Sequence, residues 1–315
     1  RAGEVLPRFP VDGRDDARTI LALVAARATL ERFRARRRPD GATPERTSGC
    51  GYEPDQVLVP MGQPIGPPAD DTAFVLLHGA SGHVENFRPL AQRLARTHPV
   101  HGVRTLGVLA GETAPSSLDE VVGSALDAIK QLGRPVHLVG YSFGGLVALR
   151  LAEALGASDL LAGPVILIDT YSPAVEVLPL GTRLRNAAAF TRRHGLRRLR
   201  GWALRLLERQ LRSALHRPRG VQAWQEQLGF GDVAALGLRD IEPHLRSLLA
   251  HAADQPPYRG AVRTLRSIEL APNLPEDAGL GNLLGSNAEL VLLGGDHFSL
   301  FVSPHVDRLA VELTR

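Results

Sequence analysis

The fold of this 315-residue chain is decided by the stretch Val136-His137-Leu138-Val139-Gly140-Tyr141-Ser142-Phe143-Gly144-Gly145. Its first four residues are mostly apolar and predict a strand, and the periodicity of residues 146–155 predicts a helix. A G-x-S-x-G element joins the two, and small residues on both sides of Ser142 permit a sharp strand-to-helix turn. Such a turn lifts the serine hydroxyl to the end of a sheet, where it can serve as a nucleophile.

Further strands and helices alternate along the chain. Short apolar segments predict strands at 74–77, 100–109, 165–168, 267–270 and 290–293. Helical periodicity occurs at 87–96, at 118–132 with Ser117 as N-cap, and at 306–314. Strands that are apolar nearly throughout and alternate with helices indicate a mostly parallel sheet with helices on both faces. Functional residues of such sheets lie at the carboxyl ends of the strands.

Three polar residues follow predicted strands in this way. Ser142 follows 136–139, Asp169 follows 165–168, and His297 follows the last strand within Gly294-Gly295-Asp296-His297-Phe298. The order of serine before histidine is that of α/β-hydrolases. These residues predict acyl transfer through a covalent intermediate on Ser142, with His297 as the base and a carboxylate that orients it.

The identity of the carboxylate has alternatives. Asp277 lies in a loop after the penultimate strand, which is the other place where hydrolases carry an acid, and Asp296 adjoins His297. Adjacent residues rarely allow a carboxylate to reach the imidazole Nδ1 without strain. We therefore favour Asp169 over Asp277 and Asp296.

Two backbone amides are candidates for binding the developing oxyanion. The amide of Phe143 follows the nucleophile directly. The amide of Ala80 lies in Leu77-His78-Gly79-Ala80-Ser81-Gly82, after the first apolar strand, where this fold supplies its second donor. We interpret His78 as a residue that buttresses this loop rather than as the base.

Composition excludes several other classes of protein. No His/Cys cluster has the spacing of a metal site, and no G-x-x-x-x-G-K-[ST] loop is found. The longest apolar run, Leu160 to Ile168, has nine residues, short of the ~20 that span a bilayer, and no secretory leader is visible. The lone cysteine, Cys50, fits a reducing, cytoplasmic location. The chain starts at Arg1 and has one methionine, Met61, so we expect it to be part of a longer protein.

The net charge of +4 is unevenly distributed. Residues 183–219 contain twelve arginines and one acid, Glu208, and carry +11, which leaves −7 for the remainder. One interpretation is a solvated face of amphipathic helices. A second is attraction of an acidic carrier protein or its phosphopantetheine phosphate. Binding to nucleic acid or anionic membrane is the least favoured, because no nucleic-acid-binding module accompanies the block.

These motifs together resemble the type I thioesterase domains that end polyketide synthases and nonribosomal peptide synthetases. The resemblance covers roughly residues 70–312 and rests on His78-Gly79-Ala80-Ser81-Gly82, Phe87-Arg88-Pro89-Leu90-Ala91, Gly140 to Gly145, Val165 to Asp169 and Gly295-Asp296-His297-Phe298. The family carries its acid at the position of Asp169. It differs in often having proline where Gly79 stands, and the block after Asp169 is long for a polyketide thioesterase.

The resemblance implies an α/β-hydrolase fold and release of an acyl chain from the phosphopantetheine of a carrier protein, by macrocyclisation or hydrolysis, without a directly bound cofactor. The carrier would be a separate domain, because Ser116-Ser117-Leu118 lacks the aspartate of a carrier motif. The amphipathic segment 15–36 resembles helices through which polyketide thioesterases dimerise, which favours a polyketide or mixed assembly line. No nucleic-acid or membrane partner is expected.

The predicted organisation has three parts. Residues 1–50 form a linker and the amphipathic helix, residues 51–173 and 261–315 form the hydrolase core, and residues 174–260 form an inserted helical lid. A free-standing editing thioesterase or carboxylesterase is the alternative enzyme. A non-catalytic binding module with a hydrolase fold is the alternative of another class, and an intact Ser142, Asp169 and His297 weigh against it.

Overall fold

A computed structural model describes residues 52–156, 158–172, 188–189, 191–192, 241–249, 257–268, 274–275, 277–284 and 288–315. The predicted N-terminal helix, and with it the expected dimer contact, lies outside these residues. So does the arginine-rich block apart from four residues, and most of the predicted lid apart from helix α8 (Glu242–Leu249). The predicted domain boundaries stay a prediction.

The described core is a seven-stranded sheet in the order β1-β3-β2-β4-β5-β6-β7. Strand β1 pairs antiparallel with β3, and every other neighbouring pair is parallel. The mostly parallel α/β-hydrolase sheet expected from the sequence is therefore confirmed. The strands are β1 Leu58–Gly62, β2 Ala73–Leu77, β3 Val100–Val103, β4 Val136–Tyr141, β5 Val165–Ile168, β6 Val262–Ser267 and β7 Ala288–Leu293.

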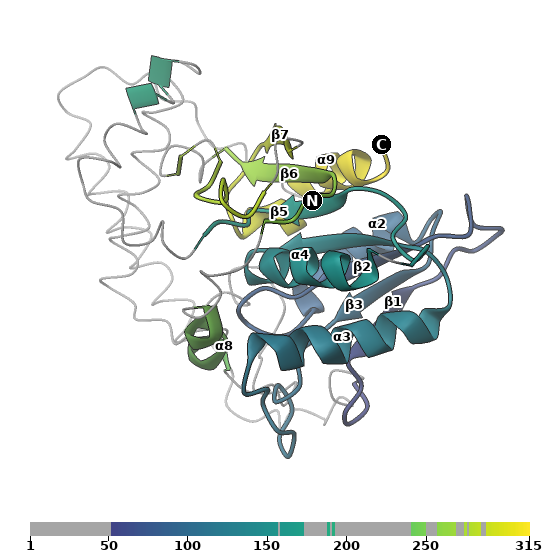
Figure 1. Cartoon of the computed structure of the whole chain (residues 1–315). Coiled ribbons are helices and arrows are strands. Elements are labelled where there is room, and N and C mark those ends of the chain that lie inside the picture. Colours follow the sequence, from purple (N-terminus) through teal and green to yellow (C-terminus); the bar gives the residue numbers. More distant parts are fainter. Residues whose placement is uncertain are drawn as a thin grey trace, which may run out of the picture.

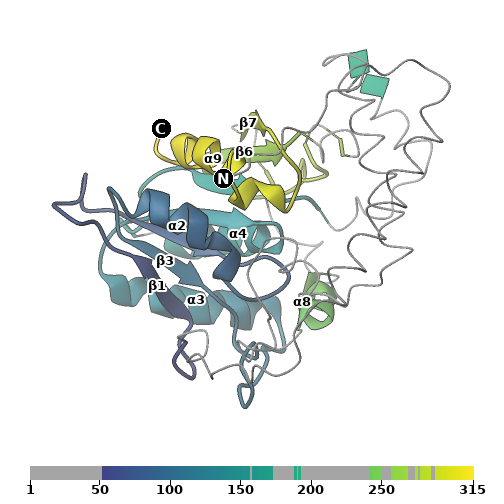
Figure 2. The ribbon, with the colours of Figure 1, turned by 180° about the vertical axis from the view of Figure 1, so that it is seen from behind.

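Helices cover both faces of the sheet. Helices α3 (Leu118–Leu132) and α4 (Phe143–Leu155) lie on the face nearer the viewer in Figure 1. Helices α2 (Arg88–Leu94) and α9 (His305–Leu313) lie on the other face, which Figure 2 turns to the front. Two short 3-10 helices, η1 (Glu85–Phe87) and η6 (Ser299–Phe301), precede α2 and α9.

The alternation of side chains along the strands separates two hydrophobic cores. In β2, Ala73, Val75 and Leu77 pack in the core beneath α3 and α4. Phe74 and Leu76 pack in the core beneath α2 and α9. Because successive residues of a strand point to opposite faces, a wholly apolar strand is needed when both faces are covered. The short apolar runs of the sequence meet this requirement.

Helix α3 has the predicted bounds and cap. The Ser117 hydroxyl accepts a hydrogen bond from the Glu120 amide, and the Glu120 carboxylate accepts from the amide and hydroxyl of Ser116. The helix ends at Gly133, whose φ of 62° lies in the left-handed region that favours glycine. Both ends of this helix are thus encoded by local chemistry.

Other predicted strands need correction. The strand expected at 267–270 is β6, Val262–Ser267, whose arginines interrupt the apolar pattern. The strand expected at 100–109 ends at Val103. Strand β1 is not predicted at all, because Leu58-Val59-Pro60-Met61-Gly62 carries proline and glycine and forms only the antiparallel edge of the sheet.

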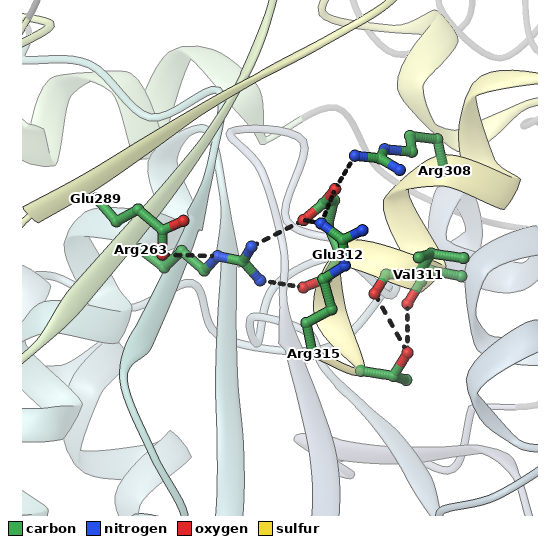
Figure 3. Close-up of polar contacts among 8 residues, drawn as sticks. Arg263, Glu289, Arg308, Val311, Glu312 and Arg315 are labelled. Atoms are coloured by element: carbon green, nitrogen blue, oxygen red, sulfur yellow. Dashed lines mark hydrogen bonds and ion pairs between the residues drawn. The ribbon is translucent and has the colours of Figure 1, made fainter.

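Arg263 of β6 belongs to a charged cluster with the C-terminal helix. Figure 3 shows Glu312 contacted by Arg263, Arg308 and Arg315. The Glu312 side chain is fully buried, and Arg263 also pairs with Glu289 of β7 at 3.1 Å. The cluster therefore joins β6, β7 and α9 around one desolvated carboxylate.

We expect Glu312→Gln to lower the free energy of unfolding by about 3 kcal/mol, because it removes the charge opposite the largely buried guanidinium group of Arg263. Urea denaturation measures this change. Asp307→Asn is the matched control. Asp307 lies on α9, as Glu312 does, but its ion pair with Arg93 is exposed, so its loss should change the free energy of unfolding little. Equal effects of the two variants would contradict the prediction.

Candidate functional site

Ser142 occupies a strained turn between β4 and α4. Its φ and ψ are 53° and −117°, and the helix begins at the next residue. A Cβ on Gly140 would lie 2.3 Å from the carbonyl oxygen of Gly144. A Cβ on Gly144 would lie 2.3 Å from the carbonyl oxygen of His78. The glycines of the motif are therefore required for the helix to start so close behind its strand.

Asp169 follows β5, the strand next to β4 in the sheet. The side chain is buried, and one carboxylate oxygen accepts a hydrogen bond of 2.6 Å from the Ser267 amide at the end of β6. The other oxygen lies 3.3 Å from Nδ1 of His297. A carboxylate fixed by a backbone donor on one side thus meets the imidazole on the other.

His297 lies in the loop between β7 and η6. Its contact with Asp169 favours the tautomer that carries a proton on Nδ1 and leaves Nε2 as an acceptor. The Tyr141 hydroxyl donates a hydrogen bond of 2.8 Å to the His297 carbonyl oxygen. Since 17% of the imidazole side chain is exposed, the ring lies at the edge of the core and can meet a ligand.

The two alternative acids have different partners. The Asp277 carboxylate accepts hydrogen bonds from the amides of Gly279 and Gly281, at 2.9 and 3.1 Å. The Asp296 carboxylate accepts from the amides of Phe298 and Ser299, at 2.9 and 2.8 Å. Both groups close turns of their own loops. Among the three candidates, the described contacts bring Asp169 to His297.

Ser142 lies beside this pair without a direct hydrogen bond to His297 in the described structure. The residue before it, Tyr141, stacks its ring on the imidazole at a centroid distance of 4.7 Å. The Ser142 amide donates to the carbonyl of Ile168, directly before Asp169. Hydrogen bonds between nucleophile and base are often long until substrate is in place. The structure therefore gathers the serine, aspartate and histidine at one edge of the sheet, after β4, β5 and β7.

The candidate oxyanion amides flank the serine. Phe143 is the first residue of α4, so its amide belongs to the first turn, where amides have no acceptor within the helix. Gly79 precedes Ala80, and a Cβ built on Gly79 would lie 3.8 Å from the Cβ of Ser142. The loop that follows β2 therefore reaches Ser142.

His78 is buried behind this loop. Nδ1 donates a hydrogen bond of 2.7 Å to the carbonyl of Gly79, and the ring stacks on Phe143 at 5.6 Å. Burial lowers the pKa of His78 to about 4, so the ring is neutral at neutral pH. These contacts are those of a residue that supports the loop, as the sequence suggested.

The sequence of this site and its surroundings matches a known protein family. The model of the thioesterase domain family matches residues 73–311. The chain belongs to this family. A thioesterase domain cleaves thioesters, and the match includes the serine turn, Asp169 and His297.

Curated relatives of this thioesterase domain are much longer proteins. Malpinin synthetase from Mortierella alpina is 33% identical over 109 residues, which are 34% of this chain and 1% of that protein. Nonribosomal peptide synthetase atqA from Aspergillus terreus is 38% identical over 119 residues, 35% of this chain and 12% of the relative. The thioesterase domain thus spans a small part of the curated relatives it matches.

Solved structures share its fold. The Vlm2 thioesterase domain bound with a dodecadepsipeptide superposes with a TM-score of 0.53 at 21% identity, covering 83% of this chain and 98% of that one. The four-domain nonribosomal peptide synthetase holo-AB3403 gives a TM-score of 0.57 at 14% identity, covering 82% of this chain and 20% of that one. At these identities the likeness shows the fold alone.

The described residues of the thioesterase domain offer neither a membrane-spanning helix nor a metal-binding cluster. None of its described helices is long and apolar enough to cross a membrane. Within the same residues, no group of three or more His, Cys, Asp or Glu side chains could hold a metal ion.

Sequence reasoning missed two residues that touch the site. The Ser267 amide holds Asp169, and it was missed because the strand that ends at Ser267 was placed too late in the chain. Tyr141 contacts His297 through its ring and its hydroxyl. Its position inside the G-x-S-x-G element was the available signal.

We expect the thioesterase domain to lose stability as the pH falls from about 6.5 to about 4. In this window the unfolded chain binds a proton at His78 that the folded chain excludes, so acid favours unfolding. The slope contributed by one such histidine is on the order of 1 kcal/mol per pH unit. His83 is also fully buried, and burial lowers its pKa to about 3, so it adds to the slope.

Urea denaturation at a series of pH values measures this slope for the parent and for His78→Gln. In the variant, the free energy of unfolding should change less steeply with pH, by the equivalent of one bound proton, whatever its absolute stability. Identical slopes would show that His78 is already protonated in the folded protein.

Proposed function

We propose that this domain releases an acyl chain from the phosphopantetheine of a carrier protein, with Ser142, His297 and Asp169 as its catalytic triad. The observation that carries the proposal is the 3.3 Å contact between the buried Asp169 carboxylate and His297 Nδ1, beside the serine turn of β4. Membership of the thioesterase domain family supports the reaction class.

The proposed first step is acylation. Ser142 Oγ attacks the thioester carbonyl while Nε2 of His297 takes its proton, and Asp169 stabilises the imidazolium that forms. The tetrahedral intermediate collapses when the carbon–sulfur bond breaks. His297 then returns the proton to the leaving thiolate, so the carrier leaves with a free thiol and the acyl group stays on Ser142.

The amides of Phe143 and Ala80 are proposed to bind the oxyanion. Peptide planarity explains how the second amide is aimed, because the C=O and the following N–H of a trans peptide point in opposite directions. The carbonyl of Gly79 accepts hydrogen bonds from His78 Nδ1 at 2.7 Å and from the Gly82 amide at 3.0 Å. By fixing this carbonyl, the two donors also fix the direction of the Ala80 N–H.

In the second step, another nucleophile takes the acyl group from Ser142. Attack by water gives a free acid, whereas attack by a hydroxyl or amine of the bound acyl chain gives a macrocycle. In each case His297 accepts the proton of the attacking group. Relatives named as nonribosomal peptide synthetases favour a peptide assembly line. The polyketide alternative and the expected dimer both rested on a helix predicted at residues 15–36. This segment lies outside the described residues.

We expect Ser142→Ala to reduce turnover of acyl N-acetylcysteamine thioesters and a p-nitrophenyl ester by at least ~10³-fold. Steady-state rates of parent and variant measure the loss, and circular dichroism checks that the variant is folded. Equal activity would refute the serine mechanism, and an inactive but folded parent would favour a binding module. A preference for the p-nitrophenyl ester over every thioester would favour a carboxylesterase.

We expect Asp169→Asn to lower kcat severely, by about 10³-fold or more, because the amide no longer stabilises the imidazolium and permits the wrong tautomer. Asp277→Asn makes the same chemical change at a carboxylate that caps its own loop, and should retain activity. The reverse pattern would identify Asp277 as the acid.

A further inference from the structure

Tyr141 lies next to Ser142, His297 and the loop that follows β2. It is the last residue of β4 and precedes Ser142. Its ring stacks on the imidazole of His297 at 4.7 Å, with 30° between the planes, and its hydroxyl donates to the His297 carbonyl oxygen at 2.8 Å. On the oxyanion side, a Cβ built on Gly79 would lie 3.1 Å from two carbons of the same ring.

The position of Tyr141 is itself fixed by packing. The side chain is 3% exposed, and its ring meets Phe301 edge-on at 4.8 Å and Phe87 at 6.2 Å. Phe301 belongs to η6, just after His297, and Phe87 belongs to η1, just after the oxyanion loop. An immobile ring with these neighbours is a rigid reference for the groups it touches.

The contacts of His297 are complementary. Asp169 holds the ring through Nδ1 and, within the described part of the chain, makes no hydrogen bond to the backbone of the loop. The Tyr141 hydroxyl holds that backbone at the carbonyl, and the Tyr141 ring covers one face of the imidazole. Together, the two partners restrict both the position and the rotation of His297.

We propose that Tyr141 is a positioning residue that holds His297 in line with Ser142 through its hydroxyl and its ring. The inference rests on the proposed function, because it assumes that His297 is the base. The hydroxyl fixes the distance of the imidazole from the serine. The face of the ring also lies against the imidazolium that forms during attack, where an aromatic quadrupole stabilises a cation.

The test compares Tyr141→Phe, Tyr141→Leu and Tyr258→Phe with the parent. Tyr258 is the matched control, because it is also a buried tyrosine (8% exposed) but lies just before β6, at the opposite end of the sheet from Ser142. For each protein, kcat and KM are measured with an acyl N-acetylcysteamine thioester at about 20 °C below its melting midpoint. The rate at which a fluorophosphonate labels Ser142 gives a second readout that does not depend on the acyl chain.

Tyr141→Phe should lower kcat and the labelling rate about tenfold, as expected for one lost hydrogen bond, with KM changed by less than about twofold. Tyr141→Leu, which loses the ring as well, should lose about a hundredfold, and Tyr258→Phe should stay within about twofold of the parent. In an Asp169→Asn background the effect of Tyr141→Phe should shrink, because residues that act through the same group are not additive.

Three outcomes would overturn the proposal: an unchanged kcat in Tyr141→Phe, an effect confined to KM, or an equal loss in Tyr258→Phe. The Ser142→Ala variant separates this failure from failure of the proposed function. If Ser142→Ala is inactive while Tyr141→Phe matches the parent, only the positioning role is lost. If Ser142→Ala retains activity, the triad itself is wrong.

Discussion

The close approach of helix α4 to the sheet is the constraint on which the site depends. A side chain at Gly140 or Gly144 would overlap backbone atoms, and one at Gly145 would lie 1.9 Å from the Thr170 hydroxyl oxygen. Because these positions lack side chains, the helix can begin one residue after the turn, with its first amides beside Ser142. The same absence allows β5, and therefore Asp169, to lie next to β4 and Ser142.

The parallel sheet then determines which residues can meet. The carboxyl ends of β2, β4, β5, β6 and β7 lie at one edge of the sheet. Each strand places one group of the site there, either on its last residue or on the loop that follows it. These are the Gly79–Ala80 loop, Ser142, Asp169, the Ser267 amide and His297. The Ser267 amide holds the Asp169 carboxylate, and the Gly82 amide and the His78 ring hold the Gly79 carbonyl. Such preorganised dipoles need no rearrangement during a reaction.

The parts of the fold that the sequence predicted are those governed by local signals. Helix α3 is bounded by Ser117 and Gly133, and β2, β4 and β5 are uninterrupted or nearly uninterrupted apolar runs. Strand β6 was misplaced because Arg263 and Arg266 stand in it. Arg263 is accommodated by Glu289 and Glu312, which are 26 and 49 residues away, and no local pattern reports such partners. The contacts of Tyr141 were missed for the same reason, since its partner His297 is 156 residues distant.

Ser142 and Asp169 both have a positive φ, which most residues other than glycine avoid. Their φ angles are 53° and 46°, in the region where a Cβ is crowded and glycine is preferred. Each such residue costs a folded protein on the order of 1 kcal/mol or more. At Asp169 this cost is offset, because the buried carboxylate accepts the hydrogen bond of the Ser267 amide. At Ser142 the folded state gives up stability in order to keep a hydroxyl there. A descendant of this chain that no longer needed the hydroxyl would become more stable by accepting glycine, so selection for stability alone would erase Ser142 from the sequence.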